Sequence, residues 1–286
     1  MFSMKKKCCK HLYVEYFCNF ALGIYPHTHT YMSVKVKEVI SALERFAPLP
    51  LQESYDNAGL QVGLTEAEVS GALLCLDVTE KVVQEAVELG CNLIVSHHPV
   101  LFKSLKQVSD ATQVQRVVRM AIQNDIAIYS SHTNLDKTED GVNYQMAERL
   151  GLIDVSPVGD CGVIGYLSAP MDARFFLDRV KDVFKCQCLM HNEVLSRPIQ
   201  SVVICGGSGE FLLDEALVQE ADAFLTGEMR YHFFMGHEQE IQICVMGHYE
   251  SEQYTIDLLE KILSDEFPHL PLYQTEVNTN PIQYLI

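Results

Sequence analysis

"ALLCLDVTEKVVQEAVELGCNLIVSHHP", residues 72–99, decides the fold class because a strand, a helix and a second strand follow one another in it. The apolar run 72–77 and the run 92–96 each predict a buried strand. Between them, Thr79 opens a helix and Gly90 closes it. A helix that joins two buried strands indicates a parallel or mixed sheet with helical cover, so we expect the α/β class.

The same alternation continues along the chain. Helical spacing begins at 36–46, and after residue 99 the pattern predicts a helix (112–125), a strand (126–131) and a helix (142–151). A second series starts at Ser201 with strand 201–205, helix 211–221, strand 223–227, helix 230–239, strand 241–247 and helix 255–265. The order of elements in the second series repeats that of the first.

Sliding the chain by 130 residues places Ala72 on Val202 and Ser96 on Thr226, and apolar positions then coincide. We interpret this as an internal repeat that forms two similar α/β domains, residues 33–155 and 156–286. The alternative interpretation is that any two strand–helix–strand units share such a pattern.

Composition limits the classes of function. The formal net charge of −17 makes nucleic acid an unlikely partner, although a local pocket for a small anionic or nucleotide ligand is compatible with it. No run approaches the ~18 apolar residues that a membrane helix needs. Most of the cysteines lie in apolar runs, which favours reduced thiols and a cytoplasmic protein.

The first 31 residues have a different character. A basic start precedes the apolar "YFCNFALGIY" (16–25), which resembles a signal peptide, but Glu15 and Asn19 interrupt this region. We therefore expect residues 1–31 to be a disordered extension, or the result of a start codon assigned too early, with Met32 opening the folded unit.

Histidines and carboxylates gather where predicted strands end. They are His97 and His98 after strand 92–96, His132 and Asp136 after strand 126–131, and His248 and Glu252 after strand 241–247. The last two pairs share the spacing His-x-x-x-acid, and we predict that they occupy equivalent places in the repeat. Ligand sites of α/β sheets form at the carboxyl ends of the strands, so these groups are predicted to share one edge.

Neutral imidazoles and carboxylates are ligands for Zn, Mn, Fe or Co. Consecutive side chains leaving a strand diverge, so His97 and His98 are predicted to serve two different ions, with a carboxylate such as Glu252 bridging them. The alternative for a single His-x-x-x-acid pair is a helix cap or a hydrogen bond. His132 is the weakest member and is interpreted as a partner that orients a ligand without touching metal.

Three further motifs have both a structural and a functional interpretation. Asp56 and Asn57 in "SYDNAGLQVG" (54–63) are typical of an Asx-turn, and a role in the site is the alternative. The glycine-rich "CGGSGE" (205–210) indicates a tight turn more strongly than a phosphate cradle. Glu228 in "LTGEMRYH" (225–232) follows a strand and is a candidate proton carrier.

The motifs "SYDNAGLQVG", "VSHHPVLF", "SSHTNLD", "LTGEMRYH" and "GHYESE", in this order, resemble the Nif-three-like family, whose members are often labelled GTP cyclohydrolase type 2 homologues. The resemblance covers the chain from about Ser33 to its end. It implies two similar α/β domains, a toroidal homohexamer and a dinuclear metal centre held by His97, His98, Asp136, His248 and Glu252. Tyr55 stands where the family commonly has tryptophan, and the inserted domain of some members is absent.

These observations together predict a metal-dependent hydrolase of a nucleotide or another phosphorylated small molecule. Water whose pKa is lowered by one or both of two divalent ions would attack the substrate, and with GTP the attack would open the imidazole ring of guanine. His132 and Glu228 are the predicted catalytic proton carriers. The rival hypothesis is a non-catalytic protein that binds metal or acts as a scaffold, as a homo-oligomeric ring.

Overall fold

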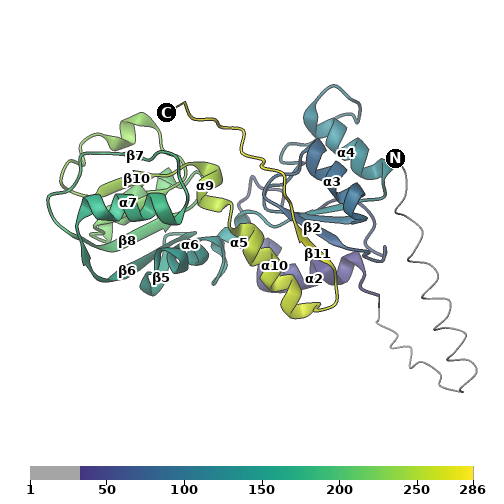
Figure 1. The fold of residues 1–286 in the computed structure, drawn as a ribbon, viewed down its shortest axis with the longest axis horizontal. Coiled ribbons are helices and arrows are strands. Elements are labelled where there is room, and N and C mark those ends of the chain that lie inside the picture. Colours follow the sequence, from purple (N-terminus) through teal and green to yellow (C-terminus); the bar gives the residue numbers. More distant parts are fainter. Residues whose placement is uncertain (1–32, 286) are drawn as a thin grey trace, which may run out of the picture. The chain divides into compact units, whose positions relative to one another are not determined.

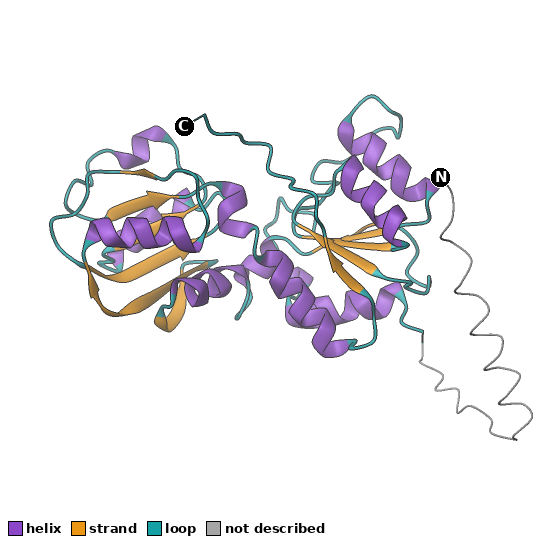
Figure 2. Ribbon diagram, viewed as in Figure 1, coloured by secondary structure: helices purple, strands orange, loops and turns teal. Residues whose placement is uncertain are grey.

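The computed structural model describes residues 33–285, so the expectations for residues 1–31 lie outside the described part. From Val34 onward the chain forms one compact unit. This unit is a mixed α/β structure with two sheets, as Figures 1 and 2 show, which confirms the predicted fold class. Among the described residues, every helix is too short or too polar to cross a membrane.

The first sheet has five strands in the order β1-β4-β3-β2-β11. Strand β1 runs antiparallel to β4, and the other neighbours are parallel. The strands are β1 (Gly59–Val62), β2 (Ala72–Cys75), β3 (Leu93–Ser96), β4 (Ala127–Ser130) and β11 (Leu272–Gln274). Since β2, β3 and β4 are parallel neighbours, the polar residues that follow them meet at one edge.

Helices cover both faces of this sheet (Figure 1). Alternate strand residues point to opposite faces, so Leu74 packs toward α2 and α10 while Leu73 packs toward α3 and α4. Helix α3 begins and ends where expected, because the Thr79 hydroxyl accepts a hydrogen bond from the Val82 amide and Gly90 takes a left-handed conformation. These helices are α2 (Val36–Phe46), α3 (Glu80–Leu89), α4 (Gln113–Gln123) and α10 (Thr255–Glu266).

The second sheet has six strands in the order β5-β6-β8-β9-β10-β7, with β8, β9 and β10 parallel. Its strands are β5 (Ile153–Val158), β6 (Gly162–Met171), β7 (Met190–His191), β8 (Ile199–Cys205), β9 (Ala223–Thr226) and β10 (Gln242–Val245). Helices α6 (Val142–Leu150) and α7 (Ala173–Val183) pack on one face, and α8 (Leu213–Val218) packs on the other. Short helices α5 (Thr133–Lys137) and α9 (His248–Glu252) follow β4 and β10.

The strand registers agree with the predicted repeat. Cys75 is opposite Ser96 in the first sheet, and Cys205 is opposite Thr226 in the second. Both pairs differ by the offset of 130 found in the sequence. The core of each sheet is therefore built on the same parallel pair with the same stagger.

Two expectations differ from the structure at the element level. The division at 155/156 does not follow the sheets, because α6 and β5 belong with the second sheet while α10 and β11 return to the first. The predicted helix 230–239 is reduced to one 3-10 turn, Tyr231–Phe234. The pairing of β11 with β2 joins segments that are far apart in the sequence, so no local pattern predicts it.

The His-x-x-x-acid pairs are also not equivalent. Ser130 and Val245 end corresponding strands, since they pair with Ser96 and Thr226 respectively. His132 lies two residues beyond Ser130 and precedes α5, whereas His248 lies three residues beyond Val245 and begins α9. The pairs are out of step by one residue, so His132 matches the position of Gly247.

Candidate metal centre

The carboxyl ends of the parallel strands bring the predicted histidines together. The His97 and His98 amides donate to the Cys75 and Leu76 carbonyl oxygens, which extends the β2–β3 ladder by two residues. The two rings then take different environments, because the His97 side chain is fully buried and that of His98 is 22% exposed. Adjacent histidines therefore present their nitrogens at different places in the same site.

Four imidazoles of the site are each fixed through Nδ1. In every case the partner atom is a carbonyl or carboxylate oxygen, so Nδ1 carries a hydrogen and Nε2 is the nitrogen that can bind an ion once any proton on it is released. Three are hydrogen bonds: His97 with the Ser131 carbonyl (2.8 Å), His98 with Asp77 (2.8 Å) and His132 with Asp56 (2.8 Å). The fourth is an ion pair between His248 and Glu228 (3.1 Å). This arrangement is typical of metal-binding histidines.

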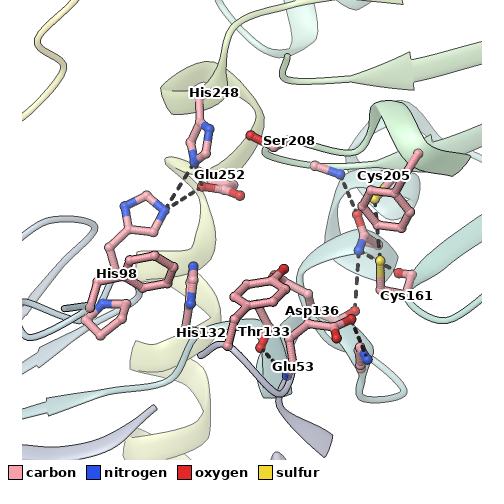
Figure 3. A pocket seen from close by; sticks show the side chains of 17 residues that line it. Glu53, His98, His132, Thr133, Asp136, Cys161, Cys205, Ser208, His248 and Glu252 are labelled. Carbon is pink, nitrogen blue, oxygen red and sulfur yellow. Dashed lines mark hydrogen bonds and ion pairs between the residues drawn. The ribbon is translucent and has the colours of Figure 1, made fainter. Parts of the chain in front are cut away.

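Glu252 lies beside His98 and His248, as Figure 3 shows. Its Oε2 atom is 3.0 Å from the Nε2 atoms of both His98 and His248, which are 3.3 Å from each other. Its Oε1 atom is 3.9 Å from His97 Nε2. The two oxygens of one buried carboxylate thus face two different sets of imidazole nitrogens.

His97 provides a direct test of whether a metal fits. Its Nε2 atom is buried and has no hydrogen-bond partner, while Asp136 Oδ1 lies 3.7 Å away. A buried polar atom without a partner is costly unless something binds it. The orphaned nitrogen and the carboxylate beside it fit a divalent ion, and His98, His248 and Glu252 form a second group with metal-ligand spacing.

The electrostatics of the cluster favour positive charge. Burial would raise the pKa of Glu252, but the imidazoles of His248, His97 and His98 hold it well below its usual range. Burial lowers the pKa of His98, yet Asp77 and Glu252 outweigh burial and raise it to about 10. Positive charge next to Glu252 is what a divalent ion would supply, and ion binding would release protons from the imidazoles.

The pKa of Asp136 is shifted in the opposite direction to that of Glu252. Burial raises the pKa of Asp136, His97 lowers it, and the negative charge of Glu252 raises it further. Two carboxylates share a small volume here, and their repulsion is relieved by a cation between them. The site is therefore matched to cations in its charge as well as in its atoms.

His132 lies beside the rings of His97 and His98, and it is hydrogen-bonded to Asp56 in the motif 54–63. Asp56 accepts from His132 Nδ1, from the amide and hydroxyl of Thr133, and from the adjacent Asn57 amide. The predicted Asx-turn does not form, because the Ala58 amide, two residues on, donates to the Gln52 side chain instead. Burial would raise the pKa of Asp56, but its bonds to His132 and Thr133 lower it to about 2. Asp56 therefore has a role in the site, which was the alternative to the Asx-turn.

The cluster forms one wall of a pocket of about 430 Å³, a size typical of small-molecule sites. Tyr55, Phe102 and Phe211 also line it and are 64%, 44% and 57% exposed. The glycine-rich segment contributes Gly206, and the neighbouring Gly207 has φ +57° and packs against Glu252. The segment 205–210 is thus the predicted tight turn, and it supports the carboxylate.

The structure brings together all five predicted ligands and His132. Glu228 lies outside the pocket lining and contacts His248 Nδ1, so it reaches the site through that ring. Two residues of the site were not predicted from the sequence: Asp77, which orients His98, and Thr279, which donates to Asp77. Asp77 follows β2 at the same sheet edge as the histidines, and this position is the signal that could have found it.

The fold and this cluster define the class: a two-sheet α/β protein with a histidine–carboxylate centre at its strand ends. Residues 34–281 match the family model Duf34/NIF3 (NGG1p interacting factor 3), and the chain belongs to this family. The resemblance found in the motifs is thereby confirmed.

Relatives and solved structures agree with this assignment. The chain is 33% identical over 267 residues to a GTP cyclohydrolase 1 type 2 homolog of Clostridium acetobutylicum, covering 88% of this chain and 100% of the relative. It is 31% identical over 272 residues to NIF3-like protein 1 of Drosophila melanogaster, covering 89% and 90%. A hypothetical protein from Staphylococcus aureus has a similar structure, with a TM-score of 0.81, 27% identity and coverage of 88% and 100%.

Proposed function

We propose that the protein is a hydrolase with a dinuclear metal centre that acts on a nucleotide or another small phosphorylated molecule. The observation that carries the proposal is the placement of Glu252, whose two oxygens face separate sets of imidazole nitrogens. Bound divalent ions would lower the pKa of water and polarise the bond to be broken.

The described residues divide into two groups of ligands. His97 and Asp136 would hold one ion, and His98 and His248 would hold the other, with Glu252 common to both. Asp77 and Glu228 orient His98 and His248 through their Nδ1 atoms. Glu228 therefore has a positioning role in this proposal, in place of the proton-carrying role expected from the sequence.

His132 is the proposed proton carrier. Asp56 accepts from Nδ1 and leaves Nε2 with a free electron pair, as a general base requires. The charge of Asp56 would also stabilise the imidazolium once His132 takes up a proton. His132 lines the pocket, so the proton moves between Nε2 and the bound substrate or water.

Two features of the pocket support a nucleotide-like substrate. The exposed rings of Tyr55, Phe102 and Phe211 offer apolar surfaces on which a planar base could stack. The Lys137 ammonium also lines the pocket, 2.7 Å from Glu53, and provides positive charge for an anionic group. GTP is the first candidate because several relatives are called GTP cyclohydrolase 1 type 2 homologs.

The test is turnover by protein reloaded with Mn, Zn or Fe, using GTP and a panel of phosphorylated compounds. We expect hydrolysis by the wild type and by His191→Ala, whose histidine is exposed and outside the pocket lining, but not by His98→Ala. Tight metal binding without turnover of any panel member would instead favour the non-catalytic metal-binding or scaffold hypothesis.

The division of the ligands has its own test. His97→Ala and His98→Ala should each weaken a distinct metal position, measured as metal content after dialysis against graded chelator. Equal loss of both ions from either variant would contradict the division. The homohexamer implied by the family resemblance remains a prediction, and light scattering of the eluted protein tests it.

A further inference from the structure

Two cysteines meet in the wall of the pocket, apart from the proposed ligands. Cys161 Sγ is 3.6 Å from Cys205 Sγ, and both thiols are free. Figure 3 shows the two sulfur atoms joined by a dashed line on the right of the view, with His98 and His248 on the left. Both cysteines line the pocket, so a small solute that enters it reaches them.

The fold holds these two thiols next to each other. Cys161 lies in the turn between β5 and β6, where Val158 pairs with Gly162. Cys205 ends β8, and the adjoining residue Ile204 pairs with Val163 of β6. One sulfur therefore lies in the turn that precedes β6 and the other at the end of its neighbour β8, so the pairing of these strands brings the two thiols together.

Hydrogen bonds of Asn143 join the segments that carry the two thiols to the segment that carries a proposed metal ligand. Its amide nitrogen donates to the Cys161 carbonyl (2.7 Å) and to the Asp136 carbonyl (3.3 Å), and its oxygen accepts from the Gly206 amide (2.8 Å). Asn143 is buried, so these bonds are shielded from water. Asn143 therefore connects the Cys161 turn to the backbone that carries the proposed ligand Asp136.

We propose that Cys161 and Cys205 are a redox-active dithiol that closes to a disulfide when a peroxide enters the pocket. Closure needs the sulfurs to approach from 3.6 Å to a bond of about 2.05 Å, a movement that the turn at Cys161 can supply. Cys161 is the sulfur that meets the oxidant, because it is partly exposed whereas Cys205 is buried.

The chemistry takes place in two balanced steps. The Cys161 thiolate attacks one peroxide oxygen, the O–O bond breaks, and the other oxygen leaves as water after taking up a proton, so that Cys161 becomes a sulfenic acid. The Cys205 thiol then attacks the Cys161 sulfur, the S–S bond forms, the S–O bond breaks, and a second water leaves. The two sulfurs lose two electrons in total, and hydrogen peroxide is reduced to two waters.

The test uses the full chain treated with hydrogen peroxide, followed by alkylation in denaturant, digestion and mass spectrometry. We expect a linked peptide containing Cys161 and Cys205 that dithiothreitol cleaves, with two fewer alkylated thiols than the ten in the sequence. The exposed Cys188 provides the matched control, so Cys188→Ser should keep the link and Cys161→Ser should lose it.

Alkylation of both cysteines after peroxide treatment would overturn the proposal, as would accumulation of sulfinic acid at Cys161 with Cys205 still alkylated. Protection of both thiols that a chelator reverses, without a linked peptide, would also overturn it and indicate bound metal instead. A second readout is metal retention, which should change on oxidation of the wild type but not of Cys161→Ser. That readout rests on the proposed function, whereas the linked peptide does not.

Discussion

Replacement of Gly207 by alanine tests whether the glycine-rich turn positions Glu252. Gly207 has φ +57°, and a Cβ atom built there lies 2.3 Å from Glu252 Oε1 and 3.3 Å from its Cδ. Gly90 provides a matched control, since it has φ +72° and a Cβ there meets nothing within 4 Å. Both substitutions impose a left-handed conformation on alanine, but only one of them collides with a proposed ligand.

The expected effects follow from this geometry. The conformational penalty of about 1–2 kcal/mol applies to both variants. In Gly207→Ala, ordinary contact requires the Glu252 oxygen to retreat by about 1 Å, which exceeds the ~0.5 Å within which a site must be held. We expect metal affinity to fall about ten- to hundred-fold, the range found when the orientation of ligands is disturbed.

The assay combines metal content after dialysis against graded chelator with the thermal midpoint of the metal-free protein. The two variants share the backbone penalty, so any further lowering of the Gly207→Ala midpoint without metal measures the cost of displacing the Glu252 side chain. Only Gly207→Ala should lose metal at lower chelator concentration. If it retains metal as well as Gly90→Ala does, the turn does not position Glu252 and the central place of this carboxylate is wrong.

Three further predictions concern the same centre. Asp77→Asn should weaken the position that contains His98 about ten- to hundred-fold and spare the other, as measured by metal content; loss of both ions would contradict this. Divalent metal at a hundred times its Kd should stabilise the fold by about 2.7 kcal/mol, seen as a higher thermal midpoint that a chelator reverses, and no shift would argue against binding. Asp56→Asn should destabilise most above about pH 5: the folded pKa is lowered from 3.8 to about 2, so the stabilisation is present above 3.8 and is lost as pH falls toward 2. Urea midpoints of variant and wild type should therefore converge as the pH falls from about 5 to about 2, and a constant gap would refute the assignment.

Local patterns were sufficient for the elements around the site. The helix caps at Thr79 and Gly90 and the buried runs of β2 and β3 were predicted from neighbouring residues, and the structure agrees. The prediction of a helix over 230–239 was wrong. The apolar residues there have helical spacing, but the chain forms only the 3-10 turn Tyr231–Phe234. Spacing is a preference that tertiary packing can override.

The long-range arrangement required the structure. The return of α10 and β11 to the first sheet is a pairing between distant segments, and periodicity within either segment does not specify it. The one-residue mismatch between His132 and His248 depends on strand register, which is set by contacts across the sheet. The contact between Cys161 and Cys205 arises in the same way, from the pairing of β6 with β8.

The sequence by itself determined the α/β class, the repeated parallel strand pair and the residue types that follow each strand, because these depend on periodicity and on the shared direction of parallel strands. Only the tertiary structure decided that Glu252 lies between His98 and His97, that Asp77 orients His98, and that the His97 Nε2 atom is left without a partner. Glu252 and His98 are 154 residues apart in the chain. Their meeting depends on how the whole chain packs, and a local pattern carries no information about that distance.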